Sequence, residues 1–228
     1  MNRFLGFALP VVAVGLLFSC TSDIESAEDV LKKAESSSSA TPAVPSSSSI
    51  GGGSSSSGAP LSGTSGTFAD SRDGQTQTYK WVKIGSQIWM AENLNYNASG
   101  SKCYNNLDSN CEIYGRLYNW ETAKAACPSG WHLPSKAEWD VLGDDAKKLK
   151  ATSFGGTNDY GFSALPGGYG GSDGSFINVG DFGYWWSANE DEYGSNGAYG
   201  RNMGYNYDYA IWNDYGKSGL QSVRCVKD

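Results

Sequence analysis

The chain has 228 residues, of which 18% are charged and 13% aromatic, and its formal net charge is −7. This acidic balance provides no basic field for a nucleic-acid partner. One His and five Cys leave little material for a His-based metal centre or a Ser-His-Asp triad. Thirty glycines beside abundant Trp and Tyr disfavour a helical bundle and favour a loop-rich β or α+β domain.

The amino-terminal segment predicts export and anchoring. Arg3 precedes an uncharged apolar run, Phe4–Phe18, which is shorter than the ~20 residues of a membrane span and typical of a secretory signal. The following Ser19-Cys20-Thr21 resembles a bacterial lipobox. The resemblance implies cleavage of residues 1–19 and lipid on Cys20, and hence a lipid-anchored protein of the cell envelope, exposed on the outer membrane. The alternative is an ordinary signal peptide followed by a chance Cys.

Residues 20–66 predict a tether. Ser and Gly dominate this segment, which includes three runs of four serines. It has too little apolar surface to form a core, so we expect a disordered linker. Residues 67–228 are then one domain of ordinary size.

A hairpin and two helices are expected in the first half of this domain. Tyr79–Ile84 and Gln87–Met90 predict strands joined by a type II′ turn at Gly85-Ser86. Asn119 is positioned to cap a helix at about 120–126, and a capping box starts a second helix. The box pairs Ser135 with Glu138, and the buried stripe that follows comprises Trp139, Leu142, Ala146 and Leu149.

Beyond Thr152 the pattern predicts short antiparallel strands between glycine-rich loops. The expected segments are Gly161–Pro166, Tyr184–Ala188, Ala198–Met203, Tyr207–Trp212 and Ser222–Val226.

Several blocks resemble known families. The runs NWETA (119–123), GWHLPS (130–135) and SVRCV (222–226), with Cys127, Glu138 and Trp139, are similar to C-type-lectin-like domains. The runs WVKIGSQIWMAENL (81–94), YGRLYNW (114–120), GFSALPGG (161–168) and WWSA (185–188) resemble the Fibrobacter succinogenes major paralogous domain family. The resemblance implies an α+β, C-type-lectin-like domain: two helices packed on short antiparallel strands, with long Gly/Tyr/Asn-rich loops.

Four cysteines lie in the domain, an even number that favours disulfides in an exported protein. Three pairings exist. The family resemblance implies Cys127–Cys225, which leaves Cys103–Cys111. The alternatives are a zinc site or a reactive thiol pair, as in the formylglycine-generating enzymes, which share the lectin-like fold.

Two further motifs were weighed as sites. Trp212-Asn213-Asp214 is similar to the motif with which sugar-binding C-type lectins hold Ca²⁺, although the companion Glu-Pro-Asn or Gln-Pro-Asp motif is absent. The alternative is a strand-end turn with Trp212 in the core. His132 is the single histidine, and we expect it to support the scaffold and not to act as a base.

A tyrosine-rich segment from about Tyr193 to Tyr215 is the favoured ligand surface. Tyr205, Tyr207 and Tyr209 alternate with Asn206 and Asp208, so a strand would place the rings on one face. We expect at least two rings to be exposed, opposite the helices. The alternative is that they cover the core.

The sequence thus predicts a lipid-anchored binding or adhesion module for a glycan, such as a plant polysaccharide, or for a surface protein. It predicts neither enzymatic activity nor a cofactor, apart from the calcium alternative. A structural envelope lipoprotein without a ligand and an enzyme of formylglycine-generating type are the other readings.

Overall fold

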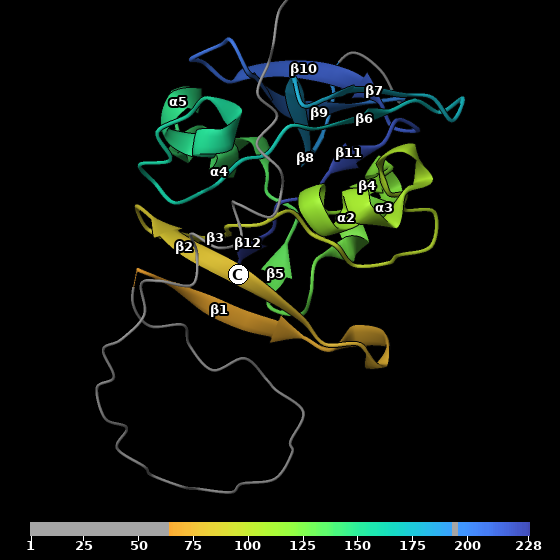
Figure 1. Cartoon of the computed structure of the whole chain (residues 1–228), viewed down its shortest axis with the longest axis horizontal. Coiled ribbons are helices and arrows are strands. Elements are labelled where there is room, and N and C mark those ends of the chain that lie inside the picture. The colour runs from red at the N-terminus through yellow and green to blue at the C-terminus, as the bar shows by residue number, and fades with distance from the viewer. Residues whose placement is uncertain (1–63, 193–195) are drawn as a thin grey trace, which may run out of the picture. The chain divides into compact units, whose positions relative to one another are not determined.

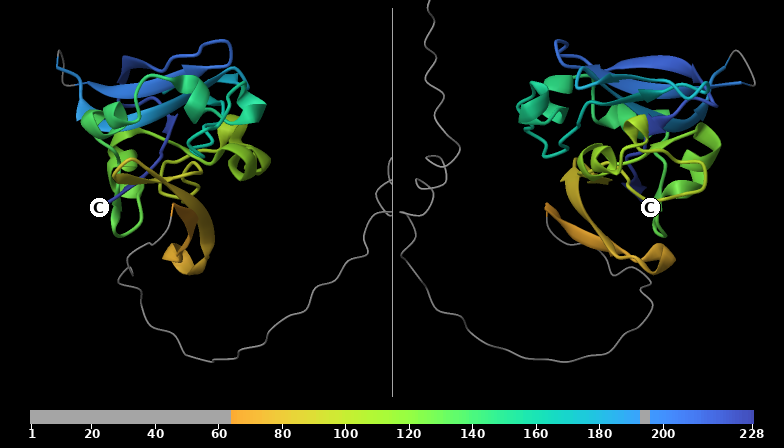
Figure 2. Two further views of the ribbon diagram at one scale, coloured as in Figure 1. Left: turned by 90° about the vertical axis from the view of Figure 1, so that its left-hand side faces the viewer. Right: turned by 45° about the vertical axis from the view of Figure 1, so that its right-hand side comes forward.

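The computed structural model describes residues 64–192 and 196–228. Within this part of the chain the fold is α+β: two sheets with a few short helices. Figure 2 shows the first hairpin at one end of the domain and the later strands at the other, with helical segments between them. The signal segment, Cys20, most of the tether and Tyr193 lie outside the described residues. No helix among the described residues is long and apolar enough to cross a membrane.

The first sheet has the strand order β1-β2-β3-β12-β5. Its strands are β1 (Ser65–Asp70), β2 (Gln77–Ile84), β3 (Gln87–Met90), β12 (Val226–Lys227) and β5 (Trp131–His132). Gly85 between β2 and β3 has φ +61°, as the expected turn requires, so the predicted hairpin is confirmed. β12 pairs with both β3 and β5, so the last strand closes against the first hairpin (Figure 1).

The second sheet has the order β10-β9-β8-β11-β4, with β6 paired to β8 and to β7. Its strands are β4 (Leu117–Tyr118), β6 (Gly167–Gly170), β7 (Phe176–Val179), β8 (Phe182–Glu190), β9 (Gly197–Gly204), β10 (Ile211–Gly216) and β11 (Gln221–Ser222). The expectation of purely antiparallel pairing is wrong, because β6 and β11 both run parallel to β8.

Three predicted strand positions are also wrong. Ser222–Val226 is not one strand, because Ser222 ends β11 in the second sheet and Val226 begins β12 in the first. Gly161–Pro166 is irregular because Gly161 and Ser163 have positive φ angles (67° and 55°), which turn the chain out of an extended path. The strand expected to start at Tyr207 starts at Ile211, because the preceding carbonyls bond to a buried lysine described below.

The helices are α2 (Asp108–Tyr114), α3 (Trp120–Ala126), α4 (Lys136–Val141) and α5 (Ala146–Leu149). Single 3₁₀ turns are η1 (Arg72–Gly74), η2 (Tyr104–Asn106) and η3 (Thr152–Phe154). α2 was not predicted from the sequence. Its apolar residues do not form one stripe, since Cys111 is buried while Ile113 is exposed.

Both predicted helix starts are confirmed. The Asn119 side chain accepts a hydrogen bond from the Thr122 N–H at 2.9 Å. Ser135 and Glu138 form the complete capping box, in which each side chain accepts from the other residue's backbone N–H.

The second helix is shorter than its hydrophobic stripe predicts. It ends as α4 at Val141, and α5 resumes at Ala146 after Gly143, whose φ is +73°. The Gly143 carbonyl accepts from Arg201, and the Asp144 carbonyl accepts from the Ala210 N–H. These tertiary hydrogen bonds replace helical ones and open the helix, while the residues of the stripe, Trp139, Leu142, Ala146 and Leu149, all stay buried.

Tryptophans fill the core. One cluster contains Trp89, Trp139 and Trp185, and the second contains Trp120 and Trp186. Two of the buried indole N–H groups donate to backbone carbonyls: Trp120 to Ser187 at 2.8 Å and Trp186 to Tyr118 at 2.7 Å. The core therefore fixes the strands by directional bonds as well as by apolar burial.

Two disulfides are present, and the predicted pairs are confirmed. Cys103–Cys111 has a Cα–Cα distance of 5.0 Å and Cys127–Cys225 one of 6.0 Å. The second joins the end of α3 to the residue before β12 across 98 positions. Closing such a loop contributes about 4–5 kcal/mol in the chain-entropy description.

Arg224, next to Cys225, is fully buried. Its guanidinium donates to Asn93 Oδ1 from Nη2 (2.8 Å) and Nε (3.1 Å), and to the Met90 carbonyl (3.2 Å). It also donates to the Phe162 and Ser163 carbonyls. Burial lowers the pKa of Arg224 to about 9. The same Asn93 oxygen accepts from the Trp185 indole at 2.9 Å, so one amide joins β3, β8 and the carboxyl-terminal segment.

Asn93→Ala should lower the free energy of unfolding by about 2–4 kcal/mol, because it leaves a buried guanidinium short of its main acceptor. Urea unfolding of the variant measures this loss. Asn97→Ala is the matched control, since Asn97 is exposed and its amide has no partner among the described residues. Equal stabilities of the two variants would contradict the role of Asn93.

Candidate functional site

The connection between β9 and β10 exposes a cluster of tyrosines. Tyr205, Tyr207 and Tyr209 are 52%, 45% and 53% exposed, so the predicted exposure is confirmed. The rings of Tyr207 and Tyr209 lie 5.5 Å apart, and Tyr207 lies 6.0 Å from the Phe182 ring of β8. We call residues 205–209 the tyrosine turn.

The geometry expected for these rings is wrong in two respects. Residues 205–208 form a turn and not a strand, so no strand periodicity aligns the rings. The turn also lies beside α5 and not opposite the helices: Tyr209 forms an isolated β-bridge with Asp145, and the Ala146 N–H donates to the Asp208 carbonyl at 3.1 Å. The interruption between α4 and α5 at Gly143 leaves the backbone at Asp145 and Ala146 free to bond to the turn.

Lys150, directly after α5, holds the backbone of the turn. Its side chain is fully buried, and Nζ donates to the carbonyls of Gly204 (3.0 Å), Tyr205 (3.1 Å) and Tyr207 (2.7 Å). These bonds match the three N–H groups of an ammonium. Burial lowers the pKa of Lys150, and the charge of the neighbouring Asp208 carboxylate partly offsets this lowering. The turn is therefore ordered without using its tyrosine rings.

Arg201 on β9 supports the same region from the other side. Its guanidinium is buried, pairs with Asp144, and lies 4.9 Å from the Trp212 ring. The Trp212 indole donates to Asp140 Oδ1 at 2.9 Å. Trp212 is thus half-buried against the helical segment, with a fold-supporting role.

A shallow hollow of about 200 Å³ lies beside the turn. It is lined by Phe182, Asn202, Gly204, Tyr207, Tyr209 and Ile211. The Asn202 amide donates to the Tyr215 hydroxyl at 2.5 Å, so this amide is oriented by the fold. Aromatic faces around a small apolar hollow can stack on a flat ligand face, and the tyrosine hydroxyls can exchange hydrogen bonds with it.

The two polar residues of the turn lie at its rim. Asn206 and Asp208 are exposed, and Asp208 has a long contact of 3.9 Å with Lys147. Both side chains are available to a ligand, and the structure places them next to the rings as the sequence predicts.

The calcium motif has a less favourable geometry. Asn213 and Asp214 are consecutive, exposed positions of β10, so their side chains point to opposite faces of the strand. In the described part of the chain no group of three or more His, Cys, Asp or Glu side chains is placed to hold a metal ion. Calcium binding through Asn213 and Asp214 stays a prediction, since Ca²⁺ takes six to eight oxygens and the motif supplies two side chains.

Comparison with known proteins gives one family. The Fibrobacter succinogenes major domain matches residues 82–227. The chain belongs to this family. The searches of curated proteins and of solved structures gave no significant match. The matched residues include the tyrosine turn, Lys150 and both disulfides.

Sequence reasoning missed the residues that position the turn in this major domain. Lys150, Arg201 and Phe182 have no local pattern that marks them, because each acts on a segment more than 20 positions away. The one available signal was Arg201 inside an otherwise apolar strand prediction, since an isolated charge there requires a buried partner.

His132 has a structural role, as expected. Its Nδ1 lies 2.6 Å from Asp228 and its Nε2 lies 2.8 Å from Glu138, the capping-box residue. Partial burial lowers the pKa of His132, but the hydrogen bonds and charges of the two carboxylates outweigh it, and the net pKa lies above 6.5. For Glu138 the directions are reversed. Burial raises its pKa, but its hydrogen bonds to Ser135 and His132 outweigh burial, and the net pKa lies below 4.5. The imidazolium joins the start of α4 to the end of the described chain.

The ion pairs of His132 with Glu138 and Asp228 should make the free energy of unfolding fall as the pH rises. A folded-state pKa above the unfolded value gives stability that is complete below pH 6.5 and lost as the pH rises through the folded pKa. We expect the loss to be about 0.5–1 kcal/mol, because 41% of the side chain is exposed and solvent screens the pair. Melting temperatures of the wild type and His132→Gln between pH 6 and 9 test this. The difference between the two proteins should shrink with pH, and a constant difference would contradict the assignment.

Proposed function

We propose that this protein is a lipid-anchored surface module that binds a glycan or a surface protein through the tyrosine turn. The supporting observation is that a turn with a fixed backbone exposes its large aromatic side chains. Of the eight large apolar residues that are exposed in the described chain, four lie here: Tyr205, Tyr207, Tyr209 and Ile211. Folding alone gives no reason to gather them at one place.

The fixed backbone favours binding. Lys150 orders the carbonyls of the turn before any ligand arrives, so association does not have to restrict that backbone. Tyrosines add large contact areas at a small cost in side-chain entropy, and Asn206 and Asp208 supply polar groups at the rim.

We propose further that the domain is C-type-lectin-like and acts by binding and not by catalysis. The disulfide from the first predicted helix to the last strand agrees with the lectin-like closure. All four cysteines of the domain are in disulfides, so the reactive thiol pair of a formylglycine-generating enzyme has no counterpart in this oxidised form.

The anchor is proposed from the sequence. Residues 1–19 would be removed, Cys20 would receive lipid, and the segment between Cys20 and the start of β1 at Ser65 would hold the domain at a distance from the outer membrane. Several acyl chains give stable membrane attachment.

Mass spectrometry of the mature protein should find Cys20 as the amino-terminal residue, with acyl groups on it. Cys20→Ser should move the protein from the membrane fraction to the soluble fraction. An unmodified amino terminus at another residue would contradict the anchor and leave the binding proposal standing.

Tyr207→Ala and Tyr209→Ala should each weaken retention on a glycan and plant-polysaccharide array by about tenfold, because central aromatic contacts dominate binding energy. Their melting temperatures should change little, since the rings are exposed. Ile177→Ala on β7 is the matched control, an exposed apolar residue outside the turn. The full chain is tested with calcium and with a chelator.

Three outcomes of this array separate the alternatives. Loss of retention in the tyrosine variants alone supports the turn as the site. Loss only on chelation, reproduced by Asn213→Ala, supports the calcium reading instead. Retention of neither glycan nor surface protein by the wild type would favour a structural envelope lipoprotein.

A further inference from the structure

A polar groove lies between β2 and α2, away from the tyrosine turn. It consists of two hollows of about 350 and 270 Å³. Both are lined by Gln77, Tyr79, Asn95, Cys111 and Glu112, so the two hollows adjoin, and we call them together the groove. Its size falls in the range of small-ligand sites.

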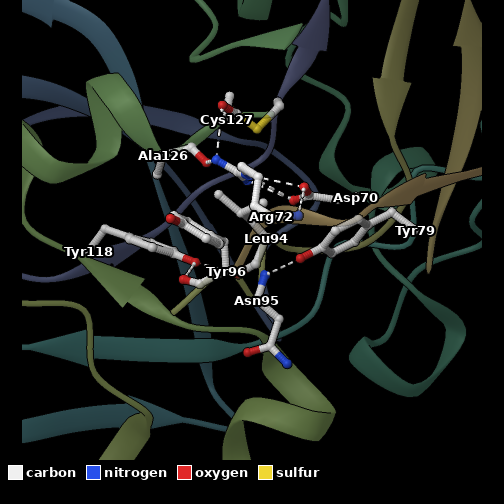
Figure 3. A network of polar contacts seen from close by, with 10 residues as sticks. Asp70, Arg72, Tyr79, Leu94, Asn95, Tyr96, Tyr118, Ala126 and Cys127 are labelled. Atoms are coloured by element: carbon white, nitrogen blue, oxygen red, sulfur yellow. Dashed lines mark hydrogen bonds and ion pairs between the residues drawn. A yellow bond between two sulfur atoms is a disulfide. The ribbon is translucent and has the colours of Figure 1, made fainter. Parts of the chain in front are cut away.

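The floor of the groove is held by hydroxyl groups (Figure 3). The Tyr79 hydroxyl accepts from the Asn95 N–H at 3.0 Å, and the Tyr118 hydroxyl donates to the carbonyls of Leu94 (3.2 Å) and Tyr96 (2.7 Å). Burial raises the pKa of Tyr79 to about 12 and also raises the pKa of Tyr118, so both hydroxyls stay protonated. With Cys111 held in its disulfide, the floor is preorganised.

One arginine of the groove is bound mainly to the fold. Arg72 pairs with Asp70 through Nε and Nη2, the latter at 2.7 Å, and donates from Nη1 to the carbonyls of Ala126 (2.8 Å) and Cys127 (3.3 Å) (Figure 3). It also stacks over the Tyr96 ring at 3.7 Å. Four of the five N–H groups of Arg72 are therefore used by the fold, and its charge is paired with Asp70.

Arg116, which lines the groove beside Arg72, is different. Among the described residues it is the only arginine whose guanidinium has no hydrogen bond, ion pair or ring contact. The other described cations that are buried or half-buried all have such a partner: Arg72, Lys136, Lys148, Lys150, Arg201, Lys217, Arg224 and Lys227. Arg116 is half-buried at the wall of the groove, and its guanidinium is not engaged by any described side chain or carbonyl.

The guanidinium of Arg116 favours ligands of one chemical class. A guanidinium fork matches a carboxylate with two parallel hydrogen bonds. The other free groups of the groove are neutral amides and carboxylates, among them Gln77, Asn97 and Glu112, which suit hydroxyl groups. Asp108 and Glu112 disfavour a densely charged polyanion, and so does the net charge of −7.

We propose that the groove binds a carboxylate-bearing saccharide, a uronate residue of an oligosaccharide, with Arg116 on its carboxylate. The amide and acid side chains of the walls take its hydroxyl groups. This site is separate from the tyrosine turn and does not depend on it.

The experiment compares two xylo-oligosaccharides of equal length, one carrying a glucuronate substituent and one neutral, on the full chain by calorimetry. The wild type should bind the acidic oligosaccharide about tenfold more tightly, as expected for hydrogen bonds to a charged group. Arg116→Gln should remove this preference. Lys83→Gln, which removes an exposed cation outside the groove, should keep it.

Several results would overturn the proposal: equal affinity of the wild type for the two oligosaccharides, no measurable binding of either at millimolar concentration, or an unchanged preference in Arg116→Gln. If Arg116→Gln unfolds, competition by free glucuronate against the acidic oligosaccharide on the wild type decides, and failure to compete is a negative result. Tyr207→Ala must leave this binding intact. If it abolishes binding, the ligand lies at the tyrosine turn and the groove proposal is wrong.

Discussion

The buried guanidinium of Arg224 is the constraint on which the rest of the domain depends. A charge without water must be surrounded by acceptors, and here they come from Asn93, Met90, Phe162 and Ser163. These residues belong to separate loops and strands, so satisfying one charge brings them to one point. The disulfide at Cys225, the next residue, holds the chain in that position.

Buried cations that donate to backbone carbonyls occur at two other places. Lys150 and Arg201 are buried and bond to backbone carbonyls of irregular segments, near the tyrosine turn and near Gly143. A domain with short helices and many glycine-rich loops has few regular hydrogen-bond ladders to order its connections. Buried cations supply that order. Each donates several hydrogen bonds to loop carbonyls, and water cannot reach the buried site to replace them.

This internal order explains how the surface can be rich in exposed aromatic and polar groups. The tyrosine turn belongs to the second sheet, and the groove with Arg116 lies between β2 of the first sheet and α2. The exposed tyrosine rings and the Arg116 side chain are not what holds the backbone, since Lys150 orders the turn and the Tyr79 and Tyr118 hydroxyls order the groove. The two surfaces are separate, so the two binding proposals can be tested independently of each other.

The sequence by itself determined the features whose physics is local. The capping side chains of Asn119 and Ser135, the turn at Gly85 and the buried stripe from Trp139 to Leu149 all act within a few residues. The lectin-like resemblance implied Cys127–Cys225 and left Cys103–Cys111, and the structure confirms both pairs. Only the tertiary structure decided that the helix opens at Gly143, that the tyrosines form a turn beside α5, and that Arg116 stays unpaired. These features depend on partners 50 or more positions away, such as Arg201 for Gly143 and Lys150 for Tyr205, and no local pattern records which distant carbonyl a buried charge will reach.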